Sequence, residues 1–200
     1  MSTLSSTVPD RTSRLHLVGA VLLALYAISI VRDPDGWRFI DGVNLLIHEG
    51  GHPVFSFFGE FATAAGGTLM QLLVPIAFTV YFRRERQRFA SCVTLLWTGE
   101  NFFNVARYMA DARARLLPLV GGDGAEHDWA YMLGRLGMLE QDQRLANAVR
   151  LVGALVLLAA VVGALNEALR RKPVPASGDA LAVEDRALRS YLAARDTDAA

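Results

Sequence analysis

A five-residue pattern typical of zinc-binding helices lies near the first quarter of the chain: His48-Glu49-Gly50-Gly51-His52. Two histidines four residues apart share one face of a helix, one turn apart, so both imidazoles can bind one Zn²⁺. A glutamate next to the first histidine lies near a metal-bound water and can act on it as general base. The pattern predicts one zinc ion, with His48 and His52 as ligands and Glu49 as the catalytic base.

The segment around this motif is more polar than an apolar helix should be. At about 100° per residue, Asp41, Asn44, His48 and His52 fall within one narrow stripe. Ionisable groups inside a membrane helix are costly and usually face a bundle interior or a wet cavity. We therefore expect the stripe to face a polar cavity. A proton relay made of the two histidines and Glu49, without a metal, is the alternative.

A hydrolytic zinc site needs a third protein ligand and one open position for water. On ligand chemistry we rank His127 first and Asp111 second, with Asp128 and Glu100 as further candidates. His127 could instead be a surface residue or the start of a helix. Asp128 precedes Trp129 and could instead be the N-cap of a short helix.

A second polar face is expected in the segment 89–110. Asn101, Asn104, Tyr108 and Asp111 share one helix face and are expected to look into the same cavity. Asn104 is assigned a catalytic part, because an amide can polarise a substrate carbonyl or stabilise an oxyanion. Hydrogen bonding between helices is the competing role for Asn101 and Asn104, and the more common one.

At these residues the chain resembles the site-2 protease family of intramembrane metallopeptidases. The shared features are His48-Glu49-x-x-His52 and a later polar helix with Asn104 and Asp111. The resemblance implies a hydrolase that cleaves a substrate helix within the membrane, with Asp111 as a ligand. This chain departs from the family because it lacks the Asn-Pro and Leu-Asp-Gly segments. The stretch 106–129 also resembles uncharacterised bacterial membrane proteins with the same motif, which implies kinship but no activity.

Apolar residues make up 52% of the 200-residue chain and fall in long runs between short charged stretches. This distribution is typical of a polytopic helical membrane protein in a lipid bilayer. We predict an all-α membrane helix bundle with a short interfacial or re-entrant helix at 129–139. The five predicted spans are 15–31, 37–59, 68–82, 89–110 and 145–169.

Three parts of the chain are predicted: a disordered N-terminus (1–13), a membrane helical domain (14–171) and a polar tail (172–200). The first apolar run lacks a small-residue cleavage pattern and is expected to be a retained helix. The formal net charge of zero gives no indication of nucleic-acid binding. The lone Cys92 rules out an internal disulfide.

Basic residues predict the orientation of a membrane protein, because they concentrate on the cytoplasmic side. With the N-terminus outside, the runs 83–88 and 170–172 both face the cytoplasm. The sequence therefore predicts an N-out, C-in protein of the bacterial inner membrane.

The leading functional hypothesis is a zinc-dependent intramembrane metallopeptidase. One alternative is a non-catalytic membrane module that binds a metal or a partner helix through the same cavity. The other is a transporter-like protein whose polar stripe conducts protons or ions. Five spans without a repeat would be small for a transporter.

Overall fold

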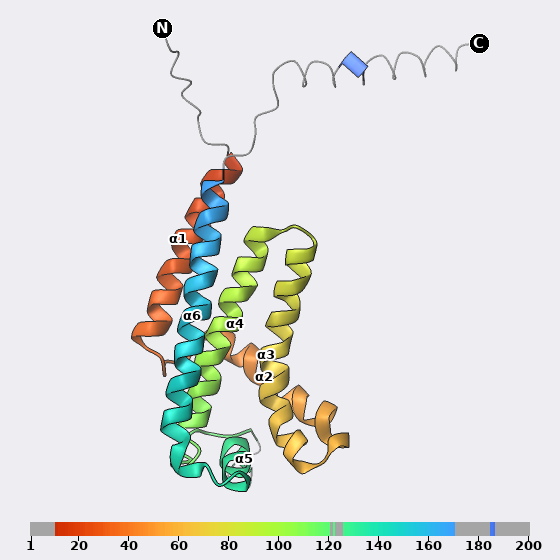
Figure 1. Ribbon diagram of the computed structural model, residues 1–200, viewed down its shortest axis with the longest axis vertical. Coiled ribbons are helices and arrows are strands. Elements are labelled where there is room, and N and C mark those ends of the chain that lie inside the picture. Colours follow the sequence, from red (N-terminus) through yellow and green to blue (C-terminus); the bar gives the residue numbers. More distant parts are fainter. Residues whose placement is uncertain (1–10, 121, 123–125, 171–184, 187–200) are drawn as a thin grey trace, which may run out of the picture. The chain divides into compact units, whose positions relative to one another are not determined.

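The computed structural model describes residues 11–120, 122, 126–170 and 185–186 (Figure 1). Its two units are Met1–Leu169 and Arg170–Ala200, and the first unit contains the candidate site. Residues 1–10 and most of the polar tail lie outside the described residues. The predicted all-helical class is confirmed, since the described residues form helices and no strand.

Six α-helices and two short 3-10 helices make up the described part of the first unit. In chain order they are α1 (Arg11–Arg32), α2 (Phe39–Phe55), η1 (Ser56–Phe58), α3 (Glu60–Arg84), α4 (Arg88–Ala110), α5 (Asp128–Arg135), η3 (Leu139–Gln141) and α6 (Asp142–Leu169). The short helix expected at 129–139 is α5, which begins one residue earlier and ends at Arg135. Helix α1 begins at Arg11, three residues before the predicted start of the membrane domain.

Three helical segments of the described chain are long and apolar enough to cross a membrane: Arg14–Arg32, Glu60–Arg84 and Leu139–Leu169. The prediction of five spans is not confirmed. Helix α2 has 17 residues, fewer than the ~20 that a bilayer requires. Helix α4 has 23 residues, but its buried positions include Ser91, Thr98, Glu100 and Asn101. Both helices contribute buried polar side chains to the interior of the bundle.

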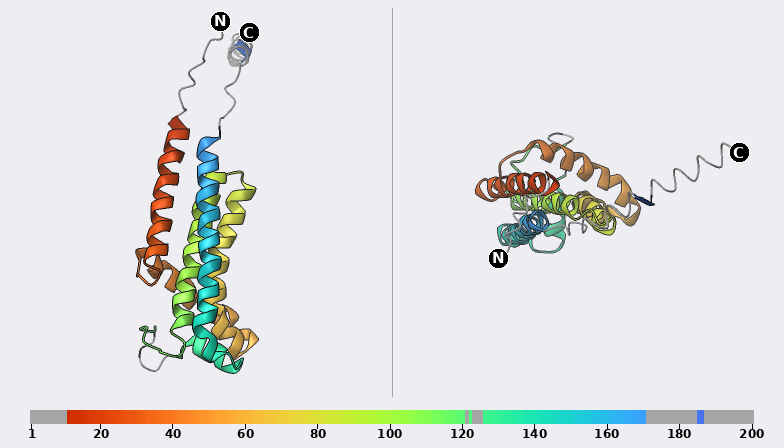
Figure 2. Two further views of the ribbon diagram at one scale, coloured as in Figure 1. Left: turned by 60° about the vertical axis from the view of Figure 1, so that its left-hand side comes forward. Right: turned by 90° about the horizontal axis from the view of Figure 1, so that it is seen from above.

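The apolar core of the bundle is built by α1, α4 and α6. Ala27 and Ile30 of α1 pack with Phe103 of α4 and with Leu157 and Ala160 of α6. A second cluster joins Ala20 of α1 and Cys92 of α4 to Ala164 and Ala168 near the end of α6. Helices α1 and α6 therefore lie antiparallel, as both views show (Figures 1 and 2).

One end of the bundle collects the start of α1, the turn between α3 and α4, and the end of α6 (Figure 1). The His16 ring of α1 stacks on Phe89 of α4, with 4.4 Å between ring centroids. At the opposite end, Asp35 pairs with Arg150 of α6 at 2.6 Å. The start of α1 and the end of α6 therefore lie at the same end of the bundle. The predicted N-out, C-in orientation stays a prediction, because the structure contains no membrane.

Candidate metal centre

Helix α2 presents the motif as the i, i+4 spacing requires. The carboxylate of Asp41 accepts a hydrogen bond of 2.5 Å from the backbone N–H of Arg38 and so caps the first turn. Two turns later, the rings of His48 and His52 lie edge to face, with 5.0 Å between centroids. One ligand atom from each histidine and one from Glu49 lie within 4.8 Å of one another. These three side chains are therefore close enough to hold a metal ion together.

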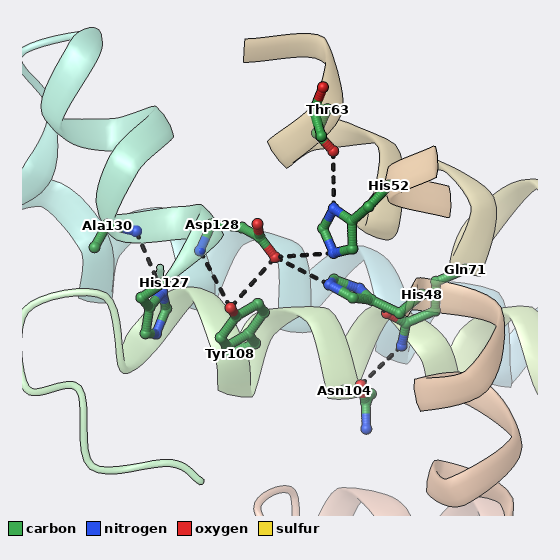
Figure 3. Close-up of polar contacts among 9 residues, drawn as sticks. All are labelled: His48, His52, Thr63, Gln71, Asn104, Tyr108, His127, Asp128 and Ala130. Atoms are coloured by element: carbon green, nitrogen blue, oxygen red, sulfur yellow. Dashed lines mark hydrogen bonds and ion pairs between the residues drawn. The ribbon is translucent and has the colours of Figure 1, made fainter. Parts of the chain in front are cut away.

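A second carboxylate, that of Asp128, faces the two histidine rings (Figure 3). Its Oδ2 lies 3.0 Å from Nε2 of His48 and 3.6 Å from Nε2 of His52. Ligands held at about 2.0–2.1 Å from zinc in a tetrahedron are about 3.3 Å apart. The two measured separations bracket that value. The alternative role for Asp128 was the N-cap of this short helix. In the structure Asp128 is the first residue of α5, and His127 is the N-cap.

The hydrogen bonds of the two Nδ1 atoms determine the tautomer of each histidine ring, and so which nitrogen carries the lone pair. Nδ1 of His52 lies 2.9 Å from the backbone carbonyl oxygen of Thr63. Nδ1 of His48 lies 3.1 Å from Oε1 of Gln71. A carbonyl oxygen only accepts hydrogen bonds, so each Nδ1 carries a hydrogen and donates it. In the neutral rings, both Nε2 atoms then point lone pairs toward the Asp128 oxygen.

The orientation of the Gln71 amide follows from a chain of hydrogen bonds across three helices. Asn104 Nδ2 donates to Asp41 Oδ1 at 3.0 Å. The Asn104 Oδ1 in turn accepts from Gln71 Nε2 at 2.8 Å, which leaves Gln71 Oε1 to accept from His48. Because a carboxylate only accepts, the direction of the whole chain is set at Asp41. This relay begins and ends on α2 and passes through α3 and α4.

Asn104 thus has the interhelical role, because its side-chain amide bonds Asp41 of α2 and Gln71 of α3. Asn101 points elsewhere: its amide donates to the backbone oxygen of Trp97, within its own helix. Glu100 accepts a hydrogen bond of 2.8 Å from the side-chain amide of Asn44. Asn44 lies on the same stripe of α2 as His48, about one turn closer to the start of that helix. Among the polar residues predicted on α4, Asn104 and Tyr108 reach the cavity beside the motif.

The structure does not bring His127 to this cluster. Its Nδ1 accepts from the backbone N–H of Ala130 at 3.3 Å, which makes His127 the N-cap of α5. Its Nε2 lies 3.4 Å from Oδ2 of Asp111, at an ion-pair distance but without hydrogen-bond geometry. Burial lowers the pKa of His127 although the Asp111 carboxylate opposes this effect. His127, which ranked first as the third ligand, therefore caps the helix that begins at Asp128 and does not contact the motif histidines.

Asp111 is also committed elsewhere. Its two carboxylate oxygens accept from the backbone N–H groups of Leu116 and Leu117, at 2.9 and 3.0 Å. These bonds shape the loop after α4, and the contact with His127 joins that loop to α5. His127 separates Asp111 from Tyr108, and the Tyr108 ring in turn meets the His48 ring edge to face, with 5.7 Å between centroids.

Tyr108 was expected only to share a polar face, and its contact with Asp128 was not anticipated. Its hydroxyl donates to Asp128 Oδ2 at 3.3 Å and accepts from the Asp128 N–H at 3.2 Å. The same ring stacks on His127, with 4.3 Å between centroids. Tyr108 therefore holds α5 against α4. Spacing along α4 was the available signal for Tyr108, whereas no sequence signal marks Gln71 or Thr63 as partners of the histidines.

Glycines allow α3 to approach the motif this closely. A Cβ atom on Gly51 would collide with the backbone carbonyl of Gly66, and one on Gly67 would collide with the His48 ring. At Gly50 a Cβ atom would meet nothing within 4 Å. The absence of a side chain at Gly51 and Gly67 therefore allows the close approach of α2 and α3, whereas Gly50 faces open space.

Cavities lie on both sides of the cluster. One, of about 130 Å³, is lined by His48, Glu49, Asn104 and Tyr108 among others. The other, of about 600 Å³, is lined by His52 and Asp128 among others. The half-buried Glu49 side chain makes no hydrogen bond or ion pair with any residue that the structure describes. Its carboxylate is therefore available to a molecule in the smaller cavity.

Comparisons of this chain with protein-family models, with curated proteins and with solved structures find no match. The resemblance to the site-2 protease family stays a prediction, and the case for a function depends on the geometry.

Proposed function

We propose that this protein is a zinc-dependent membrane metallopeptidase with His48, His52 and Asp128 as the metal ligands. One observation carries the proposal. Two imidazole nitrogens whose opposite N–H groups are already committed face a single carboxylate oxygen, at 3.0 and 3.6 Å. The lone pairs of each Nε2 and of the Asp128 oxygen repel one another unless a cation or a proton lies between them. A divalent metal satisfies all three, and two nitrogens with one oxygen suit zinc.

The arrangement around the three ligands supports hydrolysis. Zinc bound to three protein ligands keeps one position for water and lowers its pKa to ~7. Glu49 follows His48 on the same helix and lines the same cavity, so its carboxylate can accept a proton from that water. The partners of the two Nδ1 atoms hold the imidazoles in the tautomer that a metal requires. Tyr108 holds Asp128 in the same way.

We infer a membrane location from the three apolar helices, and we propose an orientation with both described ends on the cytoplasmic side. The start of α1, with Arg14, lies at the same end of the bundle as the basic turn 83–88. The sequence continues with Arg170-Arg171-Lys172 directly after α6. A single basic end supports a cytoplasmic assignment under the positive-inside rule. The proposed zinc site then lies toward the outer side, near α5 (Figure 1).

A second candidate is a proton-binding site without metal. An imidazolium also suits a carboxylate at 3.0 Å, so protonation of both histidines would satisfy the same contacts. This arrangement places two positive charges beside one carboxylate, in a half-buried site. It supports the proton relay or transport hypothesis, and the metal content of the purified protein separates it from the peptidase.

The test uses the full-length protein, purified in mild detergent without chelators. Zinc is measured by mass spectrometry, and cleavage is followed on a library of short peptides. We expect about one zinc per chain in the wild type and in Glu49→Gln, with hydrolysis in the variant reduced by ~10²–10⁴-fold. The exposed loop residue Glu85 provides a matched control, and Glu85→Gln should keep both properties.

Less than a tenth of an equivalent of zinc in the wild type, after incubation with zinc and desalting, would overturn the metal site. Zinc in both proteins with undiminished cleavage by Glu49→Gln would show that Glu49 is not the base. Stoichiometric zinc with no cleavage of any peptide would favour the non-catalytic metal-binding module.

A further inference from the structure

We propose that Arg107 and the smaller cavity form a subsite for the terminal carboxylate of a peptide, so that the enzyme removes residues from a carboxyl terminus. This inference rests on the proposed peptidase function and names its substrate class. It begins with the position of Arg107, which lines the same cavity as His48 and Glu49.

The Arg107 guanidinium is a positive charge without a carboxylate partner among the described residues. It is half-buried on α4, one turn beyond Asn104, and is the sole arginine or lysine among the described residues that line the cavity. It makes no hydrogen bond or ion pair with any described residue; its nearest recorded partner is the Trp37 ring, whose centroid lies 6.0 Å from Cζ. By contrast, Arg113 has Asp142 as a carboxylate partner, and Arg150 has Asp35.

An arginine without an anionic partner in a partly dehydrated cavity is costly, because it loses water and gains no ion pair. The carboxylates on the same wall do not supply that partner. Asp41 accepts from the Arg38 N–H and from Asn104, and Glu49 lies beyond ion-pair distance of Arg107. A ligand carboxylate would supply it, since guanidinium binds carboxylates through two parallel hydrogen bonds.

The charge of Arg107 indicates the end of a chain and not its middle, because the backbone inside a peptide chain carries no carboxylate. The guanidinium of Arg107 lines the same cavity as Glu49 and His48, so a carboxylate bound to it lies beside the proposed zinc site. Apolar side chains of the loop after α4 complete the wall: Leu117, Pro118, Leu119 and Val120. The terminal residue is therefore expected to carry a small or medium apolar side chain.

Cleavage at this position is a simple hydrolysis. The last C–N peptide bond breaks, the carbonyl carbon takes the hydroxyl of one water, and the nitrogen takes its proton by way of Glu49. The products are a peptide shortened by one residue and a free amino acid. The larger cavity, on the side of His52 and Asp128, would hold the preceding part of the peptide.

The test measures binding separately from catalysis. The zinc-loaded Glu49→Gln protein is titrated calorimetrically in detergent with N-acetyl-Ala-Leu and with its C-terminal amide. We expect the acid to bind at least about tenfold more tightly than the amide, given the strength of charged hydrogen bonds. Adding Arg107→Gln should abolish this difference without weakening the amide, and Arg107→Lys should retain part of it. Arg135→Gln, at an exposed arginine of α5, is the matched control and should retain all of it.

Equal affinity for acid and amide would overturn the subsite. So would an acid preference that survives Arg107→Gln, because the carboxylate would then be bound by the metal. Tighter binding of short-chain phosphatidylglycerol than of the peptide acid, dependent on Arg107, would identify a lipid headgroup site instead. An Arg107-dependent acid preference in a protein that binds no zinc would support the subsite and reject the peptidase. If Arg107→Gln does not fold, the comparison of acid with amide in Arg107→Lys decides.

Discussion

Oδ2 of Asp128 lies 3.0 Å from Nε2 of His48, although 80 residues separate the two in the chain. The contact joins α5 to α2 across the end of α4. Neither residue is free to turn away, because Tyr108 holds the carboxylate and Gln71 holds the imidazole. The candidate metal centre thus depends on four helices, of which the motif occupies one.

Asp128 is predicted to be the third zinc ligand, in preference to Asp111. Removal of a ligand charge by Asp128→Asn should weaken zinc binding by more than ~100-fold, since outer partners alone contribute 10–100-fold. The matched variant Asp111→Asn should still bind one zinc, because that carboxylate bonds the loop at Leu116 and Leu117. Competition with a fluorescent chelator measures both affinities. Loss of zinc from Asp111→Asn with retention in Asp128→Asn would reverse the assignment.

Gln71 is predicted to support the metal through His48. Gln71→Leu leaves Nδ1–H of His48 and the Asn104 amide without their partners, so zinc affinity should fall by ~10–100-fold. Thr79→Val removes a comparable half-buried hydrogen bond on the same helix, to Thr94, but away from the site. Both variants should lower the unfolding temperature, and only Gln71→Leu should lower zinc affinity. An equal loss of zinc from both would mean that the relay acts through general stability.

The two motif glycines are predicted to respond differently to the same substitution. Gly50→Ala meets open space and should stabilise the helix by ~0.5–1 kcal/mol, because alanine loses less backbone entropy. Gly51→Ala collides with the Gly66 backbone and should destabilise the protein by about 1–3 kcal/mol. Unfolding in detergent, monitored by circular dichroism, measures the difference. Equal stability of the two variants would mean that α2 and α3 are not in close contact.

The proposed orientation is predicted to expose opposite ends of the bundle on opposite sides of the membrane. Single cysteines are introduced in a Cys92→Ser background by Glu85→Cys in the α3–α4 turn, and by Gln141→Cys before α6. In intact bacterial cells with a permeabilised outer membrane, an impermeant maleimide should label the variant at 141 and not the one at 85. Cell lysis should make both reactive. Labelling of position 85 alone in intact cells would show the inverted orientation.

Much of the local geometry could be predicted from the sequence because it depends on the helix period alone. His48 and His52 share a face in any helix, and a stripe that also contains Asp41 and Asn44 cannot face lipid at reasonable cost. The long apolar runs likewise predicted helices near α1, α3 and α6, where composition and length suffice.

Ligand choice was beyond the sequence, because His127 and Asp128 are neighbours whose side chains diverge at the start of α5. Ligand chemistry alone favoured the histidine. The cap bond from Ala130 to His127 Nδ1 turns that ring toward Asp111, and it directs Asp128 toward α2. Which of two adjacent residues reaches a distant site depends on how their helix begins and docks.

Which helical segments are long and apolar enough to cross a membrane was also beyond the sequence, because it depends on where each helix begins and ends. A helix of about 20 residues with several polar side chains can cross the membrane, or it can pack inside the bundle without crossing. Hydropathy does not distinguish these two arrangements. The sequence by itself determined a pair of histidines on one helix face, a glutamate beside them, and an apolar all-helical chain. Only the tertiary structure decided that Asp128 completes the cluster and that α1 and α6 run antiparallel. Contacts between residues far apart in the chain follow from how whole faces pack, which no local period encodes.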